Sequence, residues 1–76
     1  MALPDRITAE PGKMGGLPCI RGMRIRVTDI LEMMAGGATE AEILTDFLFL
    51  EAEDIRAALS YAAAMVDHPI IQLAAE

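Results

Sequence analysis

The side chains best suited to chemistry in this sequence are three closely spaced arginines, Arg21, Arg24 and Arg26. They lie within residues 15–30, a stretch that also holds a Gly-Gly pair, a proline and a second turn glycine. A guanidinium group donates hydrogen bonds in a planar fork that matches phosphate oxygens. This cluster therefore predicts contacts with the phosphates of DNA. The alternative is a solvated face, or salt bridges from these arginines to Asp29 and Glu32.

A fourth arginine, Arg56, lies in the last helix that the sequence predicts. In a helix-turn-helix protein the corresponding helix enters the major groove, where arginine reads guanine. We therefore include Arg56 among the candidate DNA-binding residues. Its neighbours Glu53 and Asp54 disfavour this role, because the phosphate backbone repels carboxylates.

The sequence holds no arrangement of residues typical of an active site. Its paired carboxylates are Glu53–Asp54 and Glu40 with Glu42, all at predicted helix starts. Capping and the helix dipole explain acidic residues at such positions. His68 precedes a proline and has no candidate nucleophile nearby in the sequence. We expect no catalytic residues and no enzymatic activity.

Metal and cofactor sites are also not expected. A single cysteine, Cys19, and a single histidine, His68, are too few for a zinc site within one chain. The pair Gly15-Gly16 lacks the lysine and the following helix of a phosphate-binding loop. We expect Cys19 to be a small buried side chain, as free cysteines usually are.

Charge is distributed unevenly along the 76 residues. Residues 1–27 hold five basic and two acidic residues, a net charge of +3, whereas residues 28–76 hold one arginine and ten acids, a net charge of −9. The total of −6 repels nucleic acid at long range. A local basic patch is still able to bind DNA, particularly if a dimer doubles it. Alternatively, the acidic part faces a basic partner protein.

Turn residues and alternation predict a small β element before the helices. A short strand is expected over residues 6–9, followed by a loop. Two extended pieces, residues 17–20 and 24–27, flank a turn at residues 21–23 in which Gly22 supplies the positive φ. Alternation over residues 24–27 places Ile25 and Val27 on one face of the second piece.

Three helices are expected in the remaining sequence. The first is capped by Thr28 and ends at Gly36-Gly37. The second begins at a capping box formed by Thr39 and Glu42, and runs to about residue 46. The third runs over about residues 52–66, with an inner face that we expect to comprise Ile55, Ala58, Leu59, Ala62 and Val66.

The predicted fold is mainly α, a single domain over residues 1–76. A β element with turns (5–27) precedes a three-helix, helix-turn-helix-like bundle (28–66) and a short apolar tail (67–76). So small a core favours a homodimer. No run approaches the ~20 apolar residues of a membrane span, and no secretion signal is present, so we expect a cytoplasmic location.

The sequence resembles an uncharacterised bacterial and archaeal family known as domain of unknown function 433. The opening of that family runs roughly Gly-Lys-Pro-Val-Ile-x-Gly-Thr-Arg-Ile-x-Val, followed by an Ile-Leu pair. Residues 16–27 and 29–31 match this opening, residues 37–44 with Leu50 match its "Gly-x-Ser-x-Glu-Glu-Ile…Leu", and residues 53–62 match its third helix. The chain departs from the pattern at four positions. The family usually has Lys where Leu17 stands and Thr where Met23 stands. It usually has Pro where Leu48 stands, and Thr or Ser where Glu51 stands.

The resemblance implies a winged-helix-like or homeodomain-like fold and an antitoxin role. Members of the family often neighbour genes for nuclease-like toxins. Antitoxins of this kind neutralise the toxin by direct contact and bind their own promoter DNA. Two alternatives stay open: a stand-alone DNA-binding transcriptional regulator, and a protein-interaction module with no DNA contact, in which the tail adds an apolar anchor.

Overall fold

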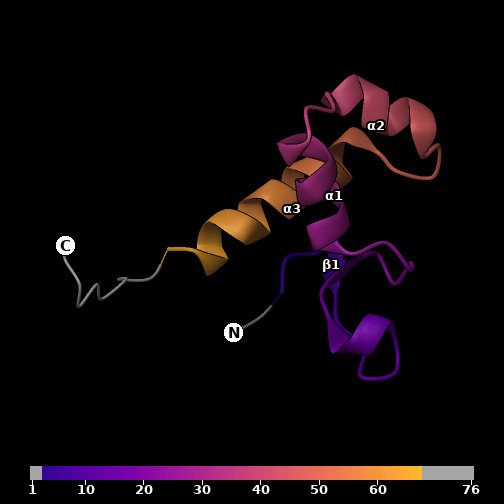
Figure 1. The fold of residues 1–76 in the computed structure, drawn as a ribbon. Helices are drawn as coiled ribbons and strands as arrows, with labels where there is room; N and C mark the ends of the chain where they lie inside the picture. The colour runs from indigo at the N-terminus through magenta and orange to yellow at the C-terminus, as the bar shows by residue number, and fades with distance from the viewer. Residues whose placement is uncertain (1–2, 68–76) are drawn as a thin grey trace.

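A computed structural model describes residues 3–67 as a small β element followed by three helices (Figure 1). This confirms the mainly α fold expected from the sequence. The predicted tail lies almost entirely outside the described residues. In chain order, the elements are β1 (Ile7–Thr8), the 3-10 turn η1 (Met14–Gly16), β2 (Cys19–Ile20), α1 (Val27–Ala35), α2 (Glu40–Asp46) and α3 (Ala52–Met65).

The β element is a two-stranded antiparallel sheet in which Ile7 pairs with Ile20 and Thr8 with Cys19. After β2 the chain turns through two residues with positive φ, Arg21 at 43° and Gly22 at 71°. The backbone N–H of Gly22 donates to Thr8 Oγ1 at 2.8 Å, which fastens the turn to β1. The predicted role of Gly22 is thus confirmed. The returning chain forms a single bridge with Cys19 before α1 begins.

Helix α1 begins two residues earlier than expected. Its N-cap is Arg26, not Thr28, because the Asp29 carboxylate accepts a hydrogen bond from the Arg26 backbone N–H at 2.8 Å. The carboxylate thereby satisfies a free N–H at the helix start. At the other end, Gly37 adopts a φ of 105° and donates to the carbonyl of Met34, which confirms the predicted glycine stop.

Helix α2 has the predicted capping box. Thr39 Oγ1 accepts from the Glu42 N–H at 3.1 Å, and Glu42 Oε1 accepts from the Thr39 N–H at 2.8 Å. The helix ends at Asp46, and residues 47–51 connect it to α3. This short connection prevents the two helices from forming one continuous rod.

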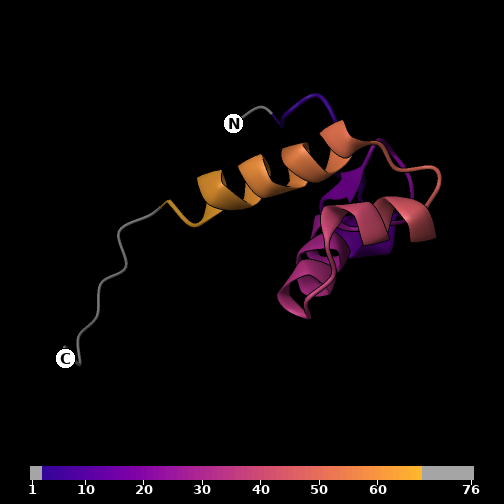
Figure 2. The same cartoon turned by 90° about the horizontal axis from the view of Figure 1, so that it is seen from above.

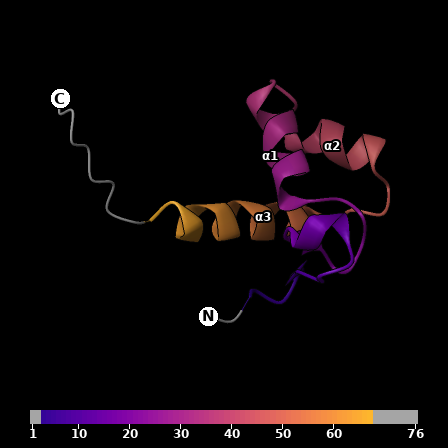
Figure 3. The same cartoon turned by 60° about the horizontal axis from the view of Figure 1, so that its bottom comes forward.

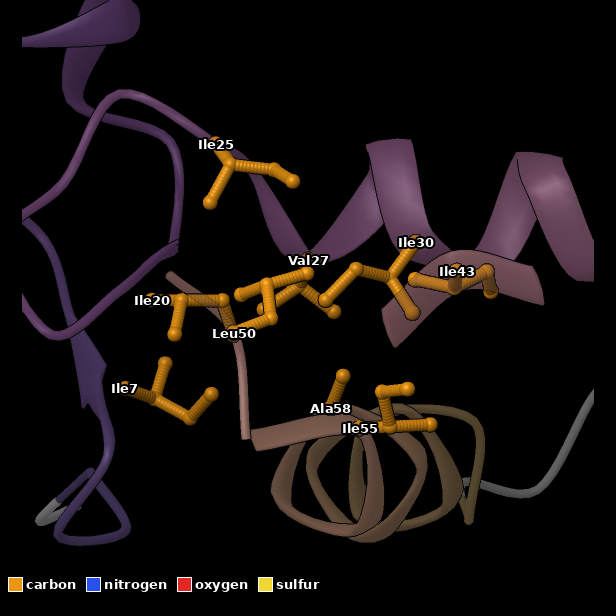
Figure 4. Packing of buried hydrophobic residues seen from close by; sticks show 9 residues of the cluster. All are labelled: Ile7, Ile20, Ile25, Val27, Ile30, Ile43, Leu50, Ile55 and Ala58. Carbon is orange, nitrogen blue, oxygen red and sulfur yellow. The ribbon is translucent and has the colours of Figure 1, made fainter. Parts of the chain in front are cut away.

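The core is built from aliphatic side chains that every regular element except η1 contributes (Figure 4). Ile7 and Ile20 of the sheet face the N-terminal half of α3, and Ile30 of α1 lies beside Ile43 of α2. Neither phenylalanine is among the buried residues, although Phe47 packs against them. The nine buried residues of the cluster are Ile7, Ile20, Ile25, Val27, Ile30, Ile43, Leu50, Ile55 and Ala58.

The predicted inner face of α3 is only half correct. Ile55 and Ala58 are buried, but Leu59 is 43% exposed and Val66, just beyond the helix, is 73% exposed. Figures 2 and 3 show the reason: α1, α2 and the β element lie against the N-terminal half of α3, and its C-terminal half extends beyond them.

None of the helices within residues 3–67 combines the length and apolar character needed to cross a membrane.

The turn after β2 requires a positive φ at Gly22, and this requirement can be tested. We expect Gly22→Ala to lower the free energy of unfolding by about 1–2 kcal/mol, because an L side chain is strained at this positive φ. Urea denaturation measures the change. Gly12→Ala is the matched control, since Gly12 has no positive φ and open space around it, and should be neutral or stabilise by about 0.5 kcal/mol. Equal effects at both glycines would contradict the explanation.

Candidate functional site

A fully buried carboxylate, Asp54, lies in the first turn of α3 between two arginines. Its Oδ1 accepts from Arg6 Nη1 at 2.8 Å and from Arg21 Nε at 3.0 Å. Its Oδ2 accepts from Arg21 Nη2 and from the Glu51 backbone N–H, both at 2.8 Å. We call Arg6, Arg21, Glu51 and Asp54 the Asp54 cluster. Four donors therefore satisfy both oxygens of the buried group.

The same cluster joins the β element to the chain before α3. Arg6 Nη1 also donates to Glu51 Oε1 at 2.6 Å, and Arg21 Nη2 donates to the Phe49 carbonyl at 2.8 Å. Arg6 precedes β1, and Arg21 lies in the turn after β2. The cluster therefore fixes the start of α3 against the sheet, across 48 and 33 residues of sequence.

Burial and hydrogen bonding act in opposite directions on the pKa of Asp54. Burial raises this pKa, but the hydrogen bonds from Arg21, Arg6 and the Glu51 N–H lower it by more. The resulting pKa is about 2. The carboxylates in turn raise the pKa of both guanidinium groups. All three groups stay charged at neutral pH. The cluster is suited to holding the fold together and unsuited to proton transfer.

Two other predicted site residues also pair with neighbouring carboxylates. Arg26 Nη2 lies 2.6 Å from Asp29 Oδ1, which confirms one of the salt bridges offered as an alternative. This hydrogen bond lowers the pKa of Asp29. Arg56 Nη1 lies 2.8 Å from Glu53 Oε1, with both side chains exposed.

Arg24 differs from the other three candidates. Within residues 3–67 it forms no ion pair, and its side chain lines an open groove. The structure does not gather the four predicted DNA-binding arginines into one patch of free charge, since Arg21, Arg26 and Arg56 are each paired. Their DNA contacts stay a prediction.

The groove is an open hollow on the surface, with a volume of about 670 Å³. It lies between the chain that follows the β2 turn, one side of α1, and the loop after α2. Phe47 and Phe49 meet edge to face there, with ring centroids 6.0 Å apart, and Leu48 between them is 84% exposed. The lining is mostly apolar and comprises Met23, Arg24, Ile25, Asp29, Glu32, Met33, Phe47 and Phe49.

No metal centre is apparent in the part of the chain that the structure describes, where no three His, Cys, Asp or Glu side chains group together. Cys19 is buried, as expected, and its thiol donates to the Leu17 carbonyl at 3.4 Å. The described residues thus offer a charged cluster that is structural and an apolar groove that is open.

Comparison with known proteins agrees with the architecture. A family model described as "Protein of unknown function (DUF433)" matches residues 7–62. This range includes every residue that lines the groove, and all of the Asp54 cluster except Arg6. The chain belongs to the DUF433 family.

Two relatives illustrate this membership. An uncharacterized protein, y4eO, of Sinorhizobium fredii (strain NBRC 101917 / NGR234) is 38% identical over 63 residues, covering 83% of this chain and 28% of that protein. The crystal structure of a DUF433 member from Anabaena variabilis ATCC 29413 has a TM-score of 0.77 and 35% identity, covering 79% of this chain and 59% of that one. The matched region therefore spans less than two thirds of either relative.

Sequence reasoning missed the two main features of this DUF433 domain. It assigned Asp54 to helix capping, which is correct, but not to pairing with Arg6 and Arg21. The available signal was position, because Asp54 adjoins Ile55 and stands four residues before Ala58, on the inner side of the helix. The groove had a weaker signal: Met23, which departs from the family pattern, lines it, and Leu48, a second departure, lies in its loop.

Removing the charge of Asp54 should destabilise the domain. We expect Asp54→Asn to lower the free energy of unfolding by roughly 2–3 kcal/mol, because two arginines lose their shared counter-charge and a buried amide replaces an acceptor. Asp29→Asn is the matched control: Asp29 also caps a helix and pairs with an arginine, but it is partly exposed, so we expect a loss under about 1 kcal/mol. Chemical denaturation of both variants tests this, and equal losses would contradict a special role for Asp54.

The cluster also predicts a pH dependence. A carboxyl group with a folded-state pKa of about 2, below its unfolded value, stabilises the fold above about pH 4, and this stabilisation is lost as the pH falls toward 2. The expected loss is on the order of 2 kcal/mol. Denaturation at a series of pH values should show the gap between wild type and Asp54→Asn narrowing in this window. A gap that stays constant down to pH 2 would disprove the assignment.

Proposed function

We propose that this DUF433 domain is a protein-binding module that acts as an antitoxin, neutralising a nuclease-like toxin by direct contact. The observation that carries the proposal is the open apolar groove beside the Phe47–Phe49 loop. Concave surfaces lined by aromatic and methionine side chains are typical of sites that accept a partner side chain. We propose binding, not catalysis, as the activity of the domain.

The charge of the chain supports a basic partner. Of the carboxylates on α1 and α2, all except that of Asp29 form no ion pair within the described residues, and the chain carries −6 overall. Glu32 stands at the edge of the groove. A nuclease-like partner must present cations along the path of its nucleic-acid substrate, and complementary charge favours rapid and specific association. Docking of this acidic surface would block that path.

Binding to promoter DNA is a second candidate function, supported by Arg24, the one predicted DNA contact without an ion pair in residues 3–67. The start of α3 argues against insertion into the major groove, since it carries Glu51 and Glu53 and is fastened to the β element through Asp54. Any DNA contact is therefore expected from the turn that holds Arg21 and Arg24. Such binding should weaken steeply as salt rises, whereas a packed protein interface should not.

Co-expression with the product of the adjacent gene tests the antitoxin proposal. We expect that product alone to stop growth, and the tagged domain to co-purify with it in a fixed ratio and restore growth. Phe49→Asp should weaken the complex about tenfold or more, because it places a charge in the apolar groove.

Ser60→Asp is the matched control for that variant, since it adds the same charge on the outer side of α3, away from the groove, and should leave the complex intact. A harmless neighbour that forms no complex would refute the antitoxin role. Salt-dependent binding of the upstream DNA segment would then favour the regulator.

A further inference from the structure

The C-terminal half of α3 projects from the body of the domain, and no helix or strand within residues 3–67 covers it. Figures 1, 2 and 3 view the molecule from three directions, and in each view this half of α3 extends beyond α1 and α2. An isolated helical segment of this length gains little from its own hydrogen bonds in water and depends on packing for most of its stability. The projecting part therefore calls for a packing partner outside the described residues of this copy.

The face it presents is a continuation of the core. Ile55 and Ala58 are buried, and the same stripe continues through Leu59, Ala62 and Met65 at helical spacing. Leu59 is 43% and Met65 41% exposed, and Val66 beyond them is 73% exposed. A stripe of this kind is typical of a buried helix face, yet beyond Tyr61, which still packs against the core, residues 3–67 leave it uncovered.

The charge pattern favours one kind of occupant. Residues 57–66 form the longest uncharged stretch in the sequence, ten residues in a chain with twelve acids. A basic partner protein binds most favourably where carboxylates are concentrated, so it does not favour this uncharged stretch. Two copies of this chain, each carrying −6, repel one another everywhere that acids lie close together. They approach most readily through a face that carries no charge.

We propose that a second copy of the chain covers this face, with α3 of one copy packed against α3 of the other across a two-fold axis near Ala62. Such an interface is the same patch on both copies, so the uncharged stripe meets itself. The small side chain of Ala62 lets the helices approach closely, while Leu59 and Met65 pack on either side of it. The groove at Phe49 lies outside this interface, so the dimer does not depend on the proposed function.

Sedimentation of the full 76-residue chain tests the proposal. We expect a dimer that persists, or tightens slightly, as salt rises, because apolar contact holds it and salt screens the repulsion between acidic copies. Leu59→Glu and Ala62→Glu should each weaken dimerisation roughly tenfold or more, by placing like charges across the axis. Ser60→Glu adds the same charge on the opposite face of α3 and should leave the dimer unchanged.

Circular dichroism establishes that these variants are folded, which is expected because Leu59 is already half exposed. A measurement on the unmodified chain adds a second test: amide hydrogen exchange over residues 59–66 should be slow at high protein concentration and accelerate on dilution. A monomeric wild-type chain would overturn the proposal. So would a dimer that Phe49→Asp dissociates and Leu59→Glu does not.

Discussion

The position of α3 depends on the interaction of Asp54 with Arg6 and Arg21. A carboxylate without solvent contact is unstable unless opposite charge and hydrogen bonds compensate for lost hydration, and here two guanidinium groups and one backbone N–H do so. The arginines come from the β element and Asp54 comes from the start of α3. Because the buried carboxylate must be compensated, these two parts of the domain are held together. The aliphatic core, assembled around Ile20 and Ile55, then closes beside the cluster.

This arrangement leaves fewer arginines of the basic segment available to bind a partner. Arg21 carries a charge that in the sequence appears available to phosphates, but its side chain is committed to Asp54 and to the Phe49 carbonyl. Arg26 is similarly committed to Asp29. Each of these ion pairs cancels one positive and one negative charge, so the net charge stays at −6 while few arginines remain unpaired. A domain of that kind favours a basic protein over a nucleic acid.

The domain presents two apolar surfaces with different surroundings. The groove at Phe47 and Phe49 is open, concave and bordered by Asp29 and Glu32, whereas the stripe from Leu59 to Met65 is convex and uncharged. We propose a toxin for the first and a second copy of the chain for the second. Separate surfaces permit a dimer to engage two partner molecules at once.

The sequence by itself determined the elements and most of their ends, the start of α1 excepted, because short-range contacts decide them: Thr39 and Glu42 are three residues apart, and Gly37 stops α1 through its own backbone. It also determined the family and the mainly α fold. Only the tertiary structure decided that Arg21 pairs with Asp54, 33 residues away, and that Leu59 continues an inner stripe beyond the reach of α1. Helical periodicity marks which face is apolar, but what covers that face depends on where the other elements end in space.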